Sequence, residues 1–185
     1  LATLALLFWL WLDTRPLPPP DAQPPRVRLF AGVALALLAG QIFLGGWTSS
    51  NYAALACPDL PTCQGQAWPE LDVKEAFTMW RGLGQSYEYG VLDNRARVTI
   101  HHLHPVGALA VSAVLLVLAG WLWRQGVAWR GHAQLILALL ALQVAIGISM
   151  VAMHLPLLLG AAHNAGAALL LLAVTKLNHR AWLQA

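Results

Sequence analysis

Two histidines inside long uncharged runs are the residues best suited to chemistry in this sequence. His104 lies near the start of the uncharged run 98–123, and His163 lies in a second such run, 131–175. Ionisable side chains within membrane-spanning segments are costly and usually face a bundle interior or a cavity. Two neutral imidazoles on separate helices are a ligand pair that haem iron accepts. The alternative is a histidine pair that only forms hydrogen bonds between helices, which the sequence leaves open.

Small residues surround both histidines. They are Gly107 and Ala108 after His104, and Ala161, Ala162, Ala165, Gly166 and Ala167 around His163. A porphyrin plane needs helices without bulky side chains beside it, and close helix packing also favours small residues. His101 lies one turn before His104 on nearly the same helix face, so His101 is a rival ligand.

The cysteines form a second chemical signal. Cys57 and Cys63 are the only two cysteines, and five residues separate them. If their loop faces an oxidising compartment, we expect a disulfide. This pair is either a structural staple or a redox-active pair. A zinc site is disfavoured because no second Cys or His pair follows at zinc spacing.

The composition predicts the elements that position these residues. Hydrophobic residues make up 58% of the chain and charged residues 10%, whereas about 25% is charged in ordinary soluble domains. The net charge of +3, without a basic cluster, disfavours a nucleic-acid partner and leaves membrane lipid as the surroundings. The sequence therefore predicts an all-α integral membrane protein.

The uncharged runs predict the domain organisation, because a spanning helix needs about 20 apolar residues. We expect a four-helix transmembrane bundle over residues 28–177, preceded by residues 1–12 as the end of a truncated transmembrane helix. The expected spans are about 28–47, 98–123, 131–152 and 157–177. Within the loop 48–97, helical spacing of apolar residues predicts a short surface helix over 70–80.

The basic residues predict the orientation. Arg and Lys flank the predicted spans on one side, which the positive-inside rule makes cytoplasmic. The Pro-rich linker 13–27 and the tail 178–185 are then cytoplasmic, and the loop 48–97 is extracytoplasmic. We expect a multi-pass protein of the cell inner membrane.

Four motifs together resemble the haem A synthase family. They are Gly45-Gly46-Trp47-Thr48, the run from Cys57 to Gly65, the run from Ile100 to Ala108 and His163-Asn164-Ala165-Gly166-Ala167. The resemblance covers roughly residues 28–177 and corresponds to the C-terminal half of that family. It implies an oxidoreductase that oxidises a ring methyl of haem O to the formyl group of haem A and serves cytochrome c oxidase assembly.

The resemblance also implies the site residues. A cofactor haem b would take His104 and His163 as axial ligands of its iron, and the family's cysteine pair maps to Cys57 and Cys63. Haem O is the implied substrate and haem O synthase an implied partner, while the substrate site would lie outside this chain. Members commonly carry Arg after the first histidine, where this chain has Pro105. Arg95 or Arg97 is therefore the candidate partner of the haem propionates.

Two other functions stay open at this stage. One is a membrane cytochrome b subunit that only transfers electrons. The other is a membrane thiol-disulfide oxidoreductase that uses Cys57 and Cys63, although such enzymes favour two intervening residues rather than five.

Overall fold

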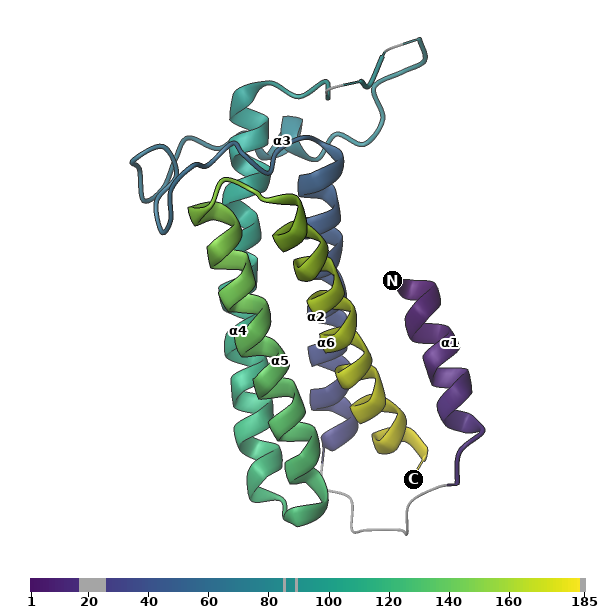
Figure 1. Ribbon diagram of the computed structural model, residues 1–185. Coiled ribbons are helices and arrows are strands. Elements are labelled where there is room, and N and C mark those ends of the chain that lie inside the picture. The colour runs from purple at the N-terminus through teal and green to yellow at the C-terminus, as the bar shows by residue number, and fades with distance from the viewer. Residues whose placement is uncertain (17–25, 85, 89, 184–185) are drawn as a thin grey trace.

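A computed structural model describes residues 1–16, 26–84, 86–88 and 90–183 of the chain. The described residues form helices joined by turns and loops, and no strand occurs among them. The helices are α1 (Ala2–Asp13), α2 (Val27–Ser50), α3 (Val73–Ala76), α4 (Asn94–Arg124), α5 (Val127–Ala152) and α6 (Leu157–Leu183) (Figure 1). Residues 17–25 of the predicted Pro-rich linker lie outside the described residues.

Four of these helices are long and apolar enough to cross a membrane. The candidate spans in α2, α4, α5 and α6 have 24, 31, 26 and 26 residues, with peak mean hydropathies of 2.0, 2.2, 2.5 and 1.9. About 20 residues suffice for one crossing. The predicted all-α class with four transmembrane helices is therefore confirmed, and the chain is a multi-pass membrane protein. The shorter helix α1 packs on α6, where the His179 ring contacts Asp13 at 2.8 Å and the Trp9 ring edge-on.

The four long helices form a closed square. Helix α2 packs against α4 and α6, and α5 packs against the same two helices. Among the described residues, α2 and α5 share no helix contact, and neither do α4 and α6. Helices α4 and α6 therefore lie on one diagonal of the bundle, and α2 and α5 lie on the other (Figure 1).

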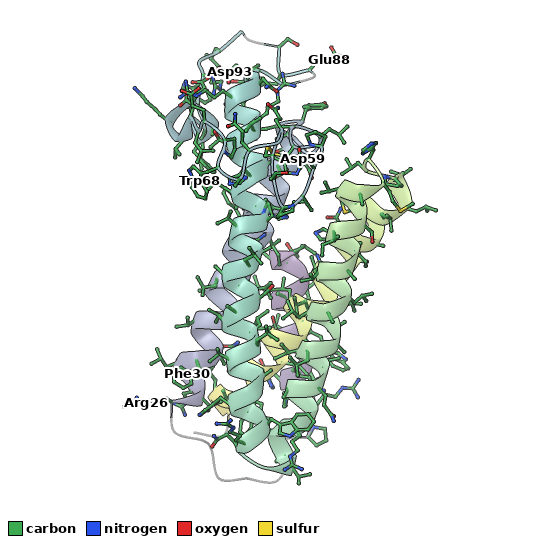
Figure 2. All side chains as sticks on the ribbon, turned by 90° about the vertical axis from the view of Figure 1, so that its left-hand side faces the viewer. Arg26, Phe30, Asp59, Trp68, Glu88 and Asp93 are labelled. Atoms are coloured by element: carbon green, nitrogen blue, oxygen red, sulfur yellow. A yellow bond between two sulfur atoms is a disulfide. The ribbon has the colours of Figure 1, made fainter. Side chains whose placement is uncertain are left out.

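The largest packed cluster lies at the end of the bundle that holds the α4–α5 turn. The largest buried cluster takes residues from the first part of α2 and α5 and from the last part of α4 and α6. Its fully buried side chains include Leu115, Leu122, Trp129, Ile136, Val174 and Leu177. In this cluster α5 contributes no buried side chain after Leu140, and α6 contributes none before Leu170. Toward the other end, the α5–α6 pair leans away from α4 (Figure 2).

The helices extend beyond the predicted spans. Helix α4 begins at Asn94 rather than near residue 98, because the Asp93 carboxylate caps it by accepting the N–H of Ala96 at 2.7 Å. Arg95 and Arg97 are therefore helical residues. Helix α6 runs to Leu183, so most of the predicted tail 178–185 is helical.

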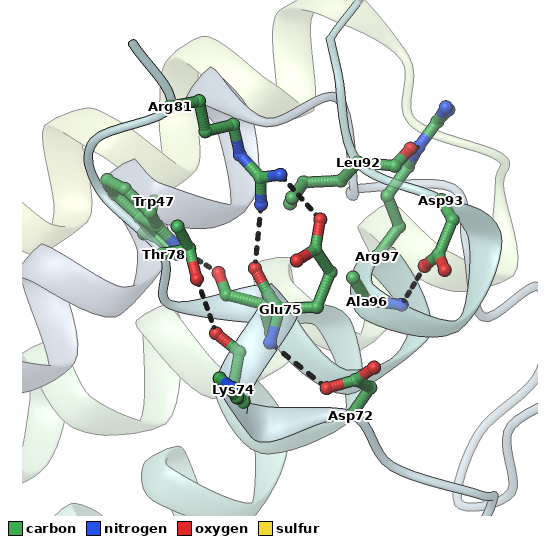
Figure 3. Close-up of polar contacts among 11 residues, drawn as sticks. Trp47, Asp72, Lys74, Glu75, Thr78, Arg81, Leu92, Asp93, Ala96 and Arg97 are labelled. Carbon is green, nitrogen blue, oxygen red and sulfur yellow. Dashed lines mark hydrogen bonds and ion pairs between the residues drawn. The ribbon is translucent and has the colours of Figure 1, made fainter.

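The predicted helix over residues 70–80 is wrong in length, since α3 is a single turn. The Asp72 carboxylate caps its start by accepting the N–H of Glu75 at 3.0 Å. Its end is fixed because other groups take the carbonyls that a longer helix would need. Arg81 donates to the carbonyl of Glu75 at 2.9 Å, and the Trp47 indole donates to that of Ala76 at 3.0 Å (Figure 3).

Candidate functional site

His104 on α4 is held by α2, the neighbouring helix. The Nε2 of Gln41 lies 2.9 Å from the carbonyl oxygen of His104 and 3.0 Å from its ring Nδ1. A Cβ added to Gly45 would lie 3.0 Å from Cε1 of the His104 ring. The ring therefore lies directly over the bare backbone of α2, in a space that a side chain at Gly45 would fill. Helix α4 continues through Pro105 without a break at this point.

His163 on α6 has the same surroundings on α5. The Nε2 of Gln143 donates to the carbonyl oxygen of His163 at 3.0 Å. A Cβ added to Gly147 would lie 3.1 Å from Cε1 of the His163 ring. The ring Nδ1 of His163 and the Oε1 of Gln143 are buried and have no hydrogen-bond partner among the described residues.

The bundle places the two histidines on opposite helices. They stand on the diagonal helices α4 and α6, beyond the large buried cluster. Both side chains are only half-buried in the bundle. The sequence analysis considered the depth of the two histidines alone, whereas the packing of the helices sets α4 and α6 on one diagonal.

This arrangement fits a haem better than a bare metal ion. Among the described residues, no group of three or more His, Cys, Asp or Glu side chains could enclose an ion. Haem brings four equatorial nitrogens of its own and needs only two axial ligands from the protein. Two imidazoles, each over a glycine, in an apolar bundle have the donor chemistry for that pair.

His101 points to a different part of the molecule. Its Nδ1 lies 2.9 Å from the carbonyl oxygen of Ala53 and 3.2 Å from the backbone nitrogen of Cys57. The side chain is buried between α4 and the loop that follows α2. The structure therefore uses His101 to attach this loop to α4, and His104 is the residue that it places with His163.

The cysteines form a disulfide beside this contact. The sulfur atoms of Cys57 and Cys63 lie 1.99 Å apart, and both side chains are buried against Val98 of α4. The bridge closes a small ring of the loop and attaches it to the same helix that carries His104. This buried position fits a structural disulfide that holds the loop in place. A redox role would depend on the reactivity of the two sulfur atoms.

Replacing both cysteines with serine separates these two roles. For a staple, we expect the free energy of loop opening to fall by about 2 kcal/mol, because closing a ring of this size constrains the unfolded chain modestly. Hydrogen exchange of the loop amides measures this change, and haem binding and turnover should persist. Loss of turnover with haem still bound would instead show a redox-active pair.

Asp59 organises the tip of the disulfide loop. Its carboxylate accepts the Thr62 hydroxyl and the backbone N–H groups of Gln64 at 2.7 Å and Gly65 at 3.0 Å. The Thr62 hydrogen bond, followed by the bond from Gly65, lowers the pKa of Asp59 below its ordinary value of 3.8. The ionised carboxylate is thus the form that the loop stabilises.

Acid should therefore loosen this tip. Because the folded pKa is the lower one, the stabilisation is present above pH 3.8 and is lost as the pH falls through the folded value. We expect the protection of the Gln64 and Gly65 amides, corrected for intrinsic exchange rates, to fall in that range. Asp59→Asn should show lower protection at neutral pH and no such acid transition; an unchanged transition in this variant would rule out Asp59 as its source.

The two candidate arginines, Arg95 and Arg97, lie on opposite faces of α4. Arg97 lies seven residues before His104, which is about two helical turns and therefore the same face of α4. Its Nε donates to the carbonyl of Leu92 at 2.9 Å. Arg95 lies about two and a half turns before His104, on the opposite face, and pairs with Glu70 at 2.6 Å. The structure thus places Arg97, and not Arg95, on the side of the histidine.

The sequence analysis missed the two glutamines. Gln41 and Gln143 lie in uncharged runs, and they were missed because their amide side chains carry no charge. A signal was present, because each is followed four residues later by the glycine under a histidine, and each histidine is followed three residues later by Gly107 or Gly166. The repeat is visible only when 41–45 is aligned with 143–147 and 104–107 with 163–166.

The fold and the site define an integral membrane four-helix bundle with one histidine on each of the two diagonal helices α4 and α6. A family model described as Cytochrome oxidase assembly protein matches residues 1–175. The chain belongs to this cytochrome oxidase assembly protein family, and the resemblance to haem A synthases is confirmed.

Individual relatives agree with this assignment. The chain is 45% identical over 181 residues to a heme A synthase of Shewanella oneidensis, covering 97% of this chain and 54% of the relative. It is 34% identical over 177 residues to a heme A synthase of Methylobacterium nodulans, covering 92% of this chain and 45% of the relative. The chain thus spans about half the length of these relatives. No solved structure shows a significant match to this chain.

Proposed function

We propose that this chain is the haem b-binding half of a haem A synthase. The observation that carries this proposal is the placement of His104 and His163 on diagonal helices, each over a glycine, beyond the large buried cluster. Family membership supports the reaction class, since the relatives named above are heme A synthases. The reaction replaces two hydrogens of a haem O ring methyl with one oxygen, which is a four-electron oxidation to the formyl group of haem A.

The residues of this chain have a binding and orienting role in the proposal. His104 and His163 would hold the iron, and the small residues beside them would let the helices approach the porphyrin. The apolar side chains of the bundle exclude water and tune the iron potential. Haem b, when bound there, supplies reversible one-electron transfer. The substrate site belongs to a part of the protein outside these residues.

The membrane orientation follows from the structure and the charges together. The start of α2, the α4–α5 turn and the end of α6 lie at one end of the bundle (Figure 1). These ends carry Arg26, Arg28, Arg124, Arg130, Lys176 and Arg180, which the positive-inside rule assigns to the cytoplasm. The disulfide and the loop 51–93 then lie on the extracytoplasmic side of the inner membrane, where an oxidising compartment favours the bridge.

Arg97 is the proposed partner of the haem propionates, because it shares a helix face with His104. Arg97→Ala should weaken haem binding by roughly 10-fold to 150-fold, since a hydrogen bond to a charged group contributes about 1.5–3 kcal/mol. Arg95→Ala is the matched control on the opposite face and should bind haem as the wild type does. Equal losses in the two variants would contradict a specific role for Arg97. The measurement is the rate of haem transfer from each purified protein to an apoprotein acceptor.

The experiment that tests the function is product analysis of the full-length protein in membranes supplied with haem O. Formation of haem A that is abolished by His104→Ala and His163→Ala supports the proposal. An intact low-spin haem spectrum without any haem A would favour a membrane cytochrome b that only transfers electrons. Dithiol oxidation that depends on the cysteines and not on the histidines would favour the thiol-disulfide oxidoreductase.

Partners in this proposal follow the reaction. Haem O comes from haem O synthase, and haem A is delivered for cytochrome c oxidase assembly. Membrane lipid surrounds the apolar outer faces of the four long helices.

A further inference from the structure

The two helix pairs of the bundle are related by an approximate two-fold axis along its length. The α2–α4 pair corresponds to the α5–α6 pair, because α2 and α5 run in one direction while α4 and α6 run in the other. The contacts agree, since α2 packs on α4 as α5 packs on α6, and the two pairs meet through α4–α5 and α6–α2. The same rotation exchanges His104 with His163 and Gln41 with Gln143.

Each pair also interlocks in the same reciprocal way. The imidazole of one helix lies over a glycine of its partner, at Gly45 and at Gly147. The glutamine of that partner lies in turn over a glycine of the histidine's helix. A Cβ added to Gly107 would lie 2.4 Å from Oε1 of Gln41, and one added to Gly166 would lie 2.3 Å from Oε1 of Gln143. Both glycines thus leave space that the amide fills.

The polar atoms in these contacts show what the amides are placed to do. The nitrogen of Gln41 lies at hydrogen-bond distance from the ring Nδ1 of His104. On the other side, His163 Nδ1 and Gln143 Oε1 are buried and have no hydrogen-bond partner in the part of the chain that the structure describes. In both helix pairs the amide nitrogen donates to the carbonyl oxygen of the histidine, at 2.9 Å from Gln41 and at 3.0 Å from Gln143.

A metal-ligating imidazole depends on neighbouring hydrogen bonds that hold its residue in place. The amide of Gln41 is fixed in its orientation, because turning it end for end would set its oxygen against the carbonyl oxygen of His104, 2.9 Å from the present amide nitrogen. Each glutamine therefore holds the histidine of the neighbouring helix through the backbone carbonyl of that histidine.

We infer that Gln41 and Gln143 are a matched pair of positioning residues that donate to the backbone carbonyls of His104 and His163 and thereby set the orientation of the two imidazole planes. The inference rests on the proposed function, because it assigns the surroundings of the same haem site. It extends that function by making the two axial positions equivalent by symmetry.

The test compares Gln41→Leu and Gln143→Leu with Gln134→Leu in the purified full-length protein. Gln134 is an exposed residue of α5 and serves as the control. Each of the first two changes should raise the rate of haem loss by about 10-fold to 100-fold, the usual effect of removing a partner of a ligand histidine. Each should also shift the g-values of the ferric low-spin electron paramagnetic resonance signal, which report the angle between the imidazole planes. The control should match the wild type.

Two further variants keep the test decisive if a leucine disturbs folding. Gly107→Ala and Gly166→Ala place a methyl group where the amide oxygen lies, so they should shift the same g-values while the glutamines stay in the sequence. Unchanged g-values and unchanged haem loss in the foldable variants of either helix pair would overturn the inference. The proposed function fails separately, if His104→Ala and His163→Ala retain the low-spin haem.

Discussion

His163→Ala and His104→Ala should each eliminate the low-spin b-type absorption bands of the protein. Removal of either imidazole leaves the iron with one axial ligand from the protein, and a single ligand gives a high-spin or empty site. The helix around His163 should tolerate the change, because its neighbours are small and its ring is only half-buried. The absorption spectrum of the reduced purified protein measures the effect.

Added imidazole provides the control for this prediction. A small ligand that enters the space left by the missing ring should restore the low-spin bands, which shows that the variant is folded. The His101→Ala protein should keep the bands without addition, because His101 contacts Ala53 and Cys57 instead of the site. Bands that persist in His104→Ala and vanish in His101→Ala would make His101 the ligand in place of His104.

Gly45→Val and Gly147→Val should have the next largest effect. The first atom of the new side chain would lie 3.0 Å from the His104 ring or 3.1 Å from the His163 ring, so each imidazole must move. Overpacking of this kind costs about 1–3 kcal/mol, which is roughly a 5-fold to 150-fold loss of haem affinity. Haem titration of the purified apoprotein measures the loss.

Gly46→Val is the matched control, since it is the same substitution one position along α2. A Cβ at Gly46 meets no atom within 4 Å, so this variant should bind haem with the affinity of the wild type. If Gly45→Val and Gly46→Val lose the same affinity, the effect comes from the helix and not from contact with His104.

The depth of the histidines could be predicted from the sequence, and their relation across the bundle could not. Uncharged runs of suitable length reveal membrane helices, and a histidine within such a run is conspicuous. The diagonal placement of His104 and His163 depends on which helices pack together, which no local pattern records. His101 shows the same limit, because its spacing suits the site while the loop at Ala53 and Cys57 holds its ring.

The differences at the helix ends have local causes. Helix α4 begins before the predicted span, because the cap at Asp93 decides where the helix begins, whereas the span was placed from the uncharged run. The predicted helix 70–80 was too long because its apolar spacing continues, whereas contacts from Trp47 and Arg81 take the carbonyls it would need. In both cases a hydrogen bond outweighed the hydropathy pattern.

Near-infrared magnetic circular dichroism of the ferric protein tests the central assignment most directly, because the ligand-to-iron charge-transfer band identifies the two axial ligands. The paired imidazoles of His104 and His163 predict a single band at the position of bis-histidine haem. A band at the position of histidine–methionine ligation, or a high-spin spectrum in the protein as purified, would contradict it.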